Sequence, residues 1–153
     1  MIFNFLIFPL EKVRQYLIQN KIYFTKVTLE HCFHHFISKE ILSGQNKMYC
    51  STCKGEFDAQ MYNQIFKNPK VLIIILNRGK GIEFDVPFTY PMKLELNDPF
   101  IDMENNPNFE GGEGSKNNQI EYELISVITH MGESSMTGHF VACAKCPVDK
   151  KWY

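Results

Sequence analysis

The strongest structural signal in this 153-residue chain is Val71-Leu-Ile-Ile-Ile-Leu76, which follows a break at Asn68-Pro69. An unbroken run of strand-forming residues predicts a strand that is buried on both faces. Arg78-Gly-Lys-Gly81 is expected to turn the chain back. Beyond that turn, apolar residues from Ile82 to Phe88 alternate with Glu, Asp and Pro, which is the period of a half-buried strand. The sequence therefore predicts two successive strands in this region.

A helix is predicted upstream of these strands. Apolar residues between Leu29 and Ile37 recur at helical spacing, and Thr28 can cap the first turn. Ser43-Gly-Gln-Asn46 is expected to end the helix. Residues 1–24 are ambiguous between a strand and a short helix. They carry neither a basic leader nor a cleavage motif, so we expect them to be part of the fold and not a signal peptide.

Two further strands are predicted towards the C-terminal end. They are Tyr122–His130 and His139–Lys145, and the turn between them contains two glycines and two serines. Residues 97–119 show no periodic pattern and predict a mobile surface loop. Trp152-Tyr153 resembles the start of a strand that stops, so we expect the chain to be truncated there.

Composition excludes several classes of protein. Hydrophobic residues make up 44% of the chain and aromatic residues 14%, which is enough for the core of one globular domain. Sixteen basic and seventeen acidic residues argue against a nucleic-acid-binding protein. No apolar run is long enough to cross a bilayer, so we expect no membrane protein. Five cysteines, an odd number, argue against a secreted disulfide scaffold and predict an intracellular protein of the cytoplasm or nucleus.

The pair Cys50-Ser-Thr-Cys53 has the spacing of a zinc knuckle. It would supply two of four tetrahedral ligands, and a pair of free thiols on a hairpin is the equally simple alternative. The remaining ligands could come from Cys143-Ala-Lys-Cys146, or from His31 and His35, which are spaced four residues apart on the polar face of the helix. A third source is a second cysteine pair upstream of Met1. The sequence alone leaves these alternatives open.

The sharpest chemical feature is His139, which follows Gly138 at the predicted start of a strand. A histidine in this position is well placed to act as a general base at the edge of a cleft. His130 lies at the other end of the same turn, and the simpler interpretation is one surface and one structural histidine. No thiol partner is evident. Cys143 is about 13 Å further along the same strand, and Cys32 lies on the apolar face of its helix.

The order of these motifs resembles one family over nearly the whole chain except residues 97–119. The segments that carry the resemblance are Leu29-Glu-His-Cys32, Glu40-Ile-Leu42, Tyr49-Cys-Ser-Thr-Cys-Lys54, Pro69–Arg78, Val86–Pro91, Leu94-Glu-Leu96, Tyr122–Gly132, Gly138-His-Phe140 and Trp152-Tyr153. Together they are similar to the C-terminal half of a ubiquitin-specific protease domain. These proteins are papain-like cysteine peptidases that remove ubiquitin from other proteins.

The resemblance implies an α+β fold, mostly antiparallel sheet with one or two helices, which forms an incomplete part of the papain-like domain. The fingers of that domain would span about residues 20–68 and the palm about 69–153, with a disordered loop at about 97–119. It also implies that ubiquitin, or proteins that carry it, are the partners of the chain. The turn at 131–138 would border the channel for the C-terminal tail of ubiquitin.

The resemblance assigns roles to four residues. His139 would be the catalytic general base, whereas His130 would be non-catalytic. Cys50 and Cys53 would be the second pair of a structural four-cysteine zinc finger, and thus half of a zinc site. No catalytic cofactor is implied.

The departures from the family pattern are as informative as the matches. The family's nucleophile lies in an Asn-x-Cys box, and this sequence contains none. The Asp or Asn that orients the histidine would follow Trp152-Tyr153, and the first zinc-binding pair would precede Met1. Gly79 and Phe140 stand where the family favours Phe and Tyr. We therefore expect that this chain alone hydrolyses no ubiquitin conjugate.

Two alternatives to an enzyme fragment remain open. One is a catalytically dead module that binds ubiquitin. The other is an unrelated small zinc protein that uses His31, His35, Cys50 and Cys53. If the chain is part of the protease domain, the missing half would leave an apolar face and an open sheet edge exposed, so we expect poor solubility or self-association.

Overall fold

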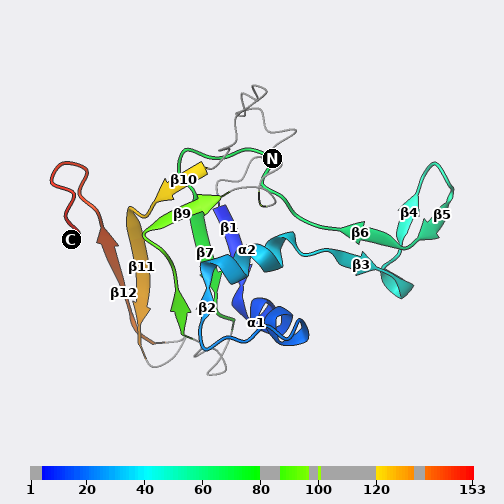
Figure 1. Ribbon diagram of the computed structural model, residues 1–153, viewed down its shortest axis with the longest axis horizontal. Helices are drawn as coiled ribbons and strands as arrows, with labels where there is room; N and C mark the ends of the chain where they lie inside the picture. The colour runs from blue at the N-terminus through cyan, green and yellow to red at the C-terminus, as the bar shows by residue number, and fades with distance from the viewer. Residues whose placement is uncertain (1–4, 80–86, 97–99, 101–119, 133–136) are drawn as a thin grey trace.

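The computed structural model of the chain describes residues 5–79, 87–96, 100, 120–132 and 137–153 (Figure 1). The helices are α1 (Leu10–Gln19), α2 (Leu29–Ile37) and the single 3-10 turn η1 (Gly44–Asn46). The strands are β1 (Phe5–Pro9), β2 (Val27–Thr28), β3 (Glu40–Leu42), β4 (Met48–Cys50), β5 (Gly55–Phe57), β6 (Ala59–Met61), β7 (Ile73–Asn77), β8 (Phe88–Thr89), β9 (Lys93–Leu96), β10 (Ile120–Glu123), β11 (Ser126–Met131) and β12 (His139–Ala144). The predicted loop at 97–119, apart from Phe100, and most of the alternating segment at 82–88 lie outside the described residues.

The segment before residue 24, whose sequence was ambiguous between a strand and a helix, contains one of each. β1 comes first along the chain and pairs in parallel with β7 at the centre of the molecule (Figure 1). Pro9 then stands at the N-cap of α1, where its fixed backbone and missing N–H are tolerated. Leu10, Val13 and Leu17 of α1 are fully buried, and their spacing of three and four residues places them on one face.

The core lies between the two helices and the inner face of the β1–β7 pair. Phe8 of β1 packs edge-to-face on Phe33 of α2, with ring centroids 5.1 Å apart. Cys32 is fully buried beside them, as its position on the apolar face of the helix predicts. Full burial of one such aromatic side chain stabilises the fold by about 1.5–3 kcal/mol.

The prediction that the strand at 71–76 is buried on both faces is wrong. Ile74 packs against the core, but Ile73 remains 51% exposed and Ile75 43%. On the neighbouring strand, Phe5 and Ile7 lie opposite these two residues and are also exposed. Parallel sheets are normally covered on both faces, so this face, composed of Phe5, Ile7, Ile73 and Ile75, is the exposed apolar face that we expected.

The helix predicted from Thr28 is present as α2. The Thr28 hydroxyl accepts a hydrogen bond from the His31 backbone N–H, and His31 Nδ1 accepts one from the Thr28 N–H, both at 3.2 Å. This reciprocal capping box satisfies two N–H groups that the helix leaves unpaired. The helix ends at Ile37 and not at Ser43-Gly-Gln-Asn46, because the intervening residues 40–42 pair with β6 as a strand instead.

Residues 40–61 form a ribbon that projects from the body of the molecule (Figure 1). β3 pairs with β6, and β4 pairs with β5 further out, both antiparallel. No side chain of this ribbon is buried. Two-stranded ribbons without a hydrophobic face are only marginally stable in water, so the ribbon has little intrinsic stability of its own.

The segment Tyr122–His130, predicted as one strand, is divided between β10 and β11. The division falls at Leu124, whose N–H donates to the Met92 carbonyl at 2.9 Å and not to a strand partner. β10 pairs with β9, and β11 pairs with β12, both antiparallel. Trp152-Tyr153 does return as extended chain, since Ala144 and Tyr153 exchange two backbone hydrogen bonds of 2.9 and 3.0 Å.

The fold is therefore α+β, as predicted. Among the described residues, four strand pairs are antiparallel, and two, β1–β7 and β2–β8, are parallel. The parallel pairs join strands that are far apart in the sequence. Within the part of the chain that the structure describes, neither helix is both long and apolar enough to span a membrane.

Candidate active site

His139 occupies the first position of β12, opposite Met131 of β11, and its side chain is exposed. The prediction that it begins a strand beside a turn is confirmed. His130 lies one register position away, opposite Phe140, and its ring centroid is 4.9 Å from that of Phe140. Because side chains alternate across a strand pair, His130 and His139 point to opposite faces of the hairpin. Only one of the two histidines can therefore contact a group that lies on a given face of the hairpin.

Two glycines hold the ends of this hairpin close together. A Cβ atom at Gly138 would collide with His130 Nε2 and the Met131 carbonyl, and one at Gly132 would lie 2.8 Å from Gly138 Cα. Neither backbone can move away without breaking the pairing of β11 and β12. Glycine is thus required at both positions because only a residue without a Cβ allows this close approach of the chain beside His139.

The described residues place no thiol where it could react with His139. Cys143 shares the strand, four residues on, which corresponds to about 13 Å, and Cys146 follows the far end of that strand at Ala144. Cys32 is in the core, where burial raises its thiol pKa to about 12 and keeps it protonated. The hairpin that carries Cys50 and Cys53 lies at the opposite end of the molecule from β12 (Figure 1). None of these cysteines therefore lies beside the exposed imidazole of His139 in the described part of the chain.

The carboxylate of Asp149, which the sequence did not single out, is engaged elsewhere. Its oxygens accept hydrogen bonds from the Tyr153 hydroxyl at 2.6 Å and from the Lys151 backbone N–H at 3.0 Å. The Tyr153 hydroxyl, foremost, holds the pKa of this carboxyl below its usual range. Asp149 follows the far end of β12, so it stabilises the C-terminal turn and does not orient His139.

Cys50 is the last residue of β4, and Cys53 lies on the tight turn that leads to β5. The Cys53 backbone N–H donates to Cys50 Sγ at 3.4 Å, and this hydrogen bond is the main cause that lowers the Cys50 pKa. Backbone N–H donation to sulfur stabilises the thiolate, which is the form that binds metal. The donor set and its local geometry thus fit one half of a zinc site.

The structure does not bring other ligands to this pair. His31 accepts a hydrogen bond through its Nδ1 in the capping box of α2. His31 and His35 are both half-buried, so neither lies on a solvated helix face. Burial lowers the pKa of both rings. Across the described part of the chain, no group of three or more His, Cys, Asp or Glu side chains is positioned to hold a metal ion.

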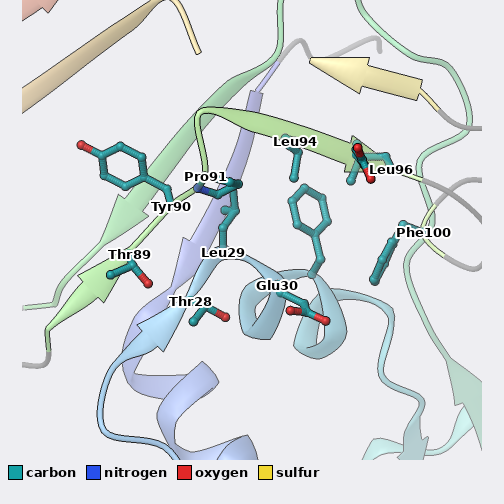
Figure 2. Close-up of a pocket in the computed structure, with 11 residues that line it drawn as sticks. Thr28, Leu29, Glu30, Thr89, Tyr90, Pro91, Leu94, Leu96 and Phe100 are labelled. Carbon is teal, nitrogen blue, oxygen red and sulfur yellow. The ribbon is translucent and has the colours of Figure 1, made fainter. Parts of the chain in front are cut away.

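A cavity of about 560 Å³ lies between α2 and the chain from β8 to β9 (Figure 2). Its lining combines apolar side chains such as Leu29, Phe33 and Leu94 with the carboxylate of Glu30. Glu30 lies 3.6 Å from His34 on the same helix. This cavity could not be predicted from the sequence because it forms between segments about 60 residues apart, and no local pattern shows that they meet.

Comparison with known proteins identifies the fold that carries this histidine. A family model described as ubiquitin carboxyl-terminal hydrolase matches residues 5–153. The chain belongs to that family. The resemblance read from the ordered motifs is thereby confirmed, and the match includes the His139 hairpin, the Cys50–Cys53 turn and the β1–β7 pair.

Curated relatives agree with this membership. The chain is 31% identical over 129 residues to ubiquitin carboxyl-terminal hydrolase Usp2 of Drosophila melanogaster, and 32% identical over 128 residues to ubiquitin carboxyl-terminal hydrolase 48 of Gallus gallus. These alignments cover 84% and 82% of this chain, but only 13% and 12% of the relatives. The chain thus spans about an eighth of the length of these relatives.

A similar solved structure is the SAGA Ubp8/Sgf11/Sus1/Sgf73 DUB module bound to ubiquitin aldehyde. The likeness has a TM-score of 0.62 at 26% identity, and it covers 83% of this chain and 28% of the other chain. The same module with a shortened Sgf11 matches with the same TM-score at 27% identity. The overall fold is therefore that of a part of the ubiquitin hydrolase domain.

Proposed function

We propose that this chain is the base-bearing part of an enzyme that removes ubiquitin from proteins by cysteine chemistry. The observation that carries the proposal is the exposed His139 at the first residue of β12, on a hairpin that Gly132 and Gly138 allow to pack closely, within a family match over residues 5–153. An exposed imidazole at the end of a paired strand can be approached by a partner group from another part of the domain.

In this function His139 accepts the proton of a cysteine thiol that another part of the domain supplies. The thiolate attacks the carbonyl carbon of the last ubiquitin glycine, and His139 gives the proton to the leaving amine as the acyl-enzyme forms. Water, whose proton His139 then accepts, hydrolyses the acyl-enzyme and releases the cysteine. His130 takes no part, because it faces the other side of the hairpin and packs on Phe140.

A chimera tests the role of His139. Residues 5–153 replace the matching segment of the Ubp8 chain in its module, and release of a fluorophore from the ubiquitin C-terminus is measured. Activity that His139→Gln lowers at least about 1,000-fold supports the proposal. The matched variant His130→Gln should retain most of the activity. A folded chimera without activity, or one that His139→Gln leaves active, contradicts it.

A second candidate is a module that binds ubiquitin without cleaving it. It is favoured by the ubiquitin aldehyde in the similar solved structure and by exposed apolar side chains on β11 and β12, such as Ile128 and Phe140. The expected result is weak binding, seen as shifts of ubiquitin amide signals when the chain is added. An in-frame Asn-x-Cys box in the coding sequence upstream of Met1 would instead favour the enzyme.

We also propose that Cys50 and Cys53 hold structural zinc and that the protein acts inside the cell, in the cytoplasm or nucleus. The thiolate-stabilising turn supports the metal, and free thiols at all five cysteines support a reducing compartment. Metal analysis of the purified chain tests the first proposal. Fractionation of cells that express a tagged chain tests the second, and secretion into the medium would contradict it.

A further inference from the structure

A second cavity, of about 610 Å³, lies between α1 and the end of α2. Tyr16 of α1 and His35 of α2 form part of its lining, and their rings pack edge-to-face with centroids 5.6 Å apart. The other lining residues are polar or charged, and they are Lys12, Gln15, Gln19, Asn20, Ser38, Lys39 and Glu40. Cavities of roughly 300–1,000 Å³ hold small organic molecules, so this one is large enough for such a ligand.

The charges that line this cavity are mainly positive. Lys12 belongs to α1, and Lys39 follows the end of α2. Within the part of the chain that the structure describes, neither lysine forms an ion pair with a carboxylate. Glu40 is the one acidic residue among the described residues of the lining. Both ammonium groups are therefore available to a negatively charged ligand.

His35 shows which charge dominates inside the cavity. Burial lowers the pKa of its ring most, the positive charge of Lys12 lowers it further, and Glu40 raises it by less. A nearby cation disfavours the protonated imidazole, whereas a nearby carboxylate favours it. The Lys12 ammonium group thus affects this ring more than the Glu40 carboxylate does. A bound anion would interact favourably with the same charge.

The backbone around the cavity does not provide a competing site for a cation. Carbonyl groups at the C-terminal end of a helix normally attract positive charge. Here the Tyr16 carbonyl already accepts hydrogen bonds from the Asn20 backbone N–H at 3.0 Å and from the Asn20 side-chain amide at 2.8 Å. The His35 carbonyl accepts the Ser38 backbone N–H at 3.2 Å and the Ser38 hydroxyl at 2.6 Å. The cavity therefore favours an anion.

We propose that this cavity binds a small organic phosphate, with the phosphate group between Lys12 and Lys39 and the organic part against the rings of Tyr16 and His35. A phosphate ester carries a charge of about −1.5 to −2 at neutral pH, which matches two ammonium groups. Lysine is a common phosphate ligand, and aromatic rings offer an apolar surface beside it. The inference is independent of the zinc assignment and of any role in ubiquitin removal.

Equilibrium dialysis of the purified full chain against phenyl phosphate, at neutral pH and low ionic strength, tests the proposal. The expected result is saturable binding of one phenyl phosphate per chain, with no binding of phenol at the same concentrations. Lys12→Gln and Lys39→Gln should each raise the dissociation constant about tenfold, because each removes one charge-assisted contact. Lys26→Gln, a matched change at an exposed lysine outside the cavity, should change it less than about twofold.

Glu40→Gln should lower the dissociation constant, because it removes the carboxylate that opposes the anion. A gain in affinity cannot result from loss of folding, and circular dichroism checks that the other variants remain folded. The absence of saturable binding by the folded chain would overturn the proposal. Equal weakening by Lys26→Gln and Lys12→Gln would also overturn it, because binding would then depend only on net charge. Inorganic phosphate that binds as tightly as phenyl phosphate would overturn the role of the organic part.

Discussion

Protonation of His31 is expected to weaken the N-terminal cap of α2. His31 Nδ1 accepts the Thr28 N–H at 3.2 Å, and a ring nitrogen accepts a hydrogen bond only when it carries no proton. Burial lowers the pKa of His31 from its ordinary value of 6.5. The folded chain therefore keeps this ring neutral at pH values where the unfolded chain already protonates it.

The direction of the pH effect follows from this difference. As the pH falls below 6.5, the His31 ring takes up a proton in the unfolded state before it does so in the folded state. This proton uptake stabilises the unfolded state relative to the folded state, so the free energy of unfolding falls. The contribution of neutral His31 to the stability of the fold is thus fully present above that pH and is lost as the pH falls towards the lowered folded pKa. His35, whose pKa burial also lowers, acts in the same direction.

The magnitude follows from the two hydrogen bonds of the capping box. Thr28→Ala removes the hydroxyl that accepts the His31 N–H and should cost about 1 kcal/mol at every pH. Loss of the bond from the Thr28 N–H to the ring should cost about another 1 kcal/mol. Glutamine at position 31 can accept the same N–H without titrating. His31→Gln should therefore change the stability at about pH 8 by less than about 0.5 kcal/mol.

Urea unfolding followed by circular dichroism, from about pH 8 to about pH 5, measures these effects. The wild-type free energy of unfolding should fall over the lower part of this range, and in His31→Gln it should fall less. Thr28→Ala should lower the whole curve. If His31→Gln lost as much stability as the wild type over the same range, the proposed coupling between the cap and protonation would be wrong.

Three further predictions test the packing. Phe33→Ala should lower the free energy of unfolding by about 3–5 kcal/mol because the ring is fully buried. Phe57→Ala, at a side chain that is 50% exposed, should cost well under half of that. Urea unfolding measures both costs, and equal costs would contradict the assigned core. Ile75→Lys, on the exposed apolar face, should reduce concentration-dependent association on a sizing column. Ile74→Lys, on the core face of the same strand, should instead unfold the chain. Unchanged association in Ile75→Lys would exclude the exposed apolar face as the surface through which chains associate. Gly138→Ala should destabilise the β11–β12 hairpin, seen as faster amide exchange at that pair, and native exchange rates there would refute the close packing.

The sequence predicted the elements whose signals are local. The apolar spacing after Thr28 and the residue types around His139 are contained in short windows, and α2 and β12 begin where these windows indicate. The end of α2 at Ile37 was missed because strand pairing of residues 40–42 with β6 competes with helix formation. Such competition depends on residues some 20 positions away.

The exposure of β7 could not be predicted, because a run of apolar residues shows only that a strand is suited to burial, and not that a layer covers it. Ile73 and Ile75 are exposed since no described element fully covers their side of the sheet. The site illustrates the same limit. The position of His139 was evident, but the opposite orientations of His130 and His139 follow only from the register of β11 and β12.

We infer that His139 has no thiol partner among the five cysteines of this chain. In the test, the purified 153-residue chain is incubated at micromolar concentration with ubiquitin that carries a fluorophore on its C-terminus. The rate of fluorophore release is measured. The expected rate of fluorophore release equals that of buffer alone. Release above buffer that is lost in His139→Gln would show that one of the five cysteines completes the site, and would contradict it.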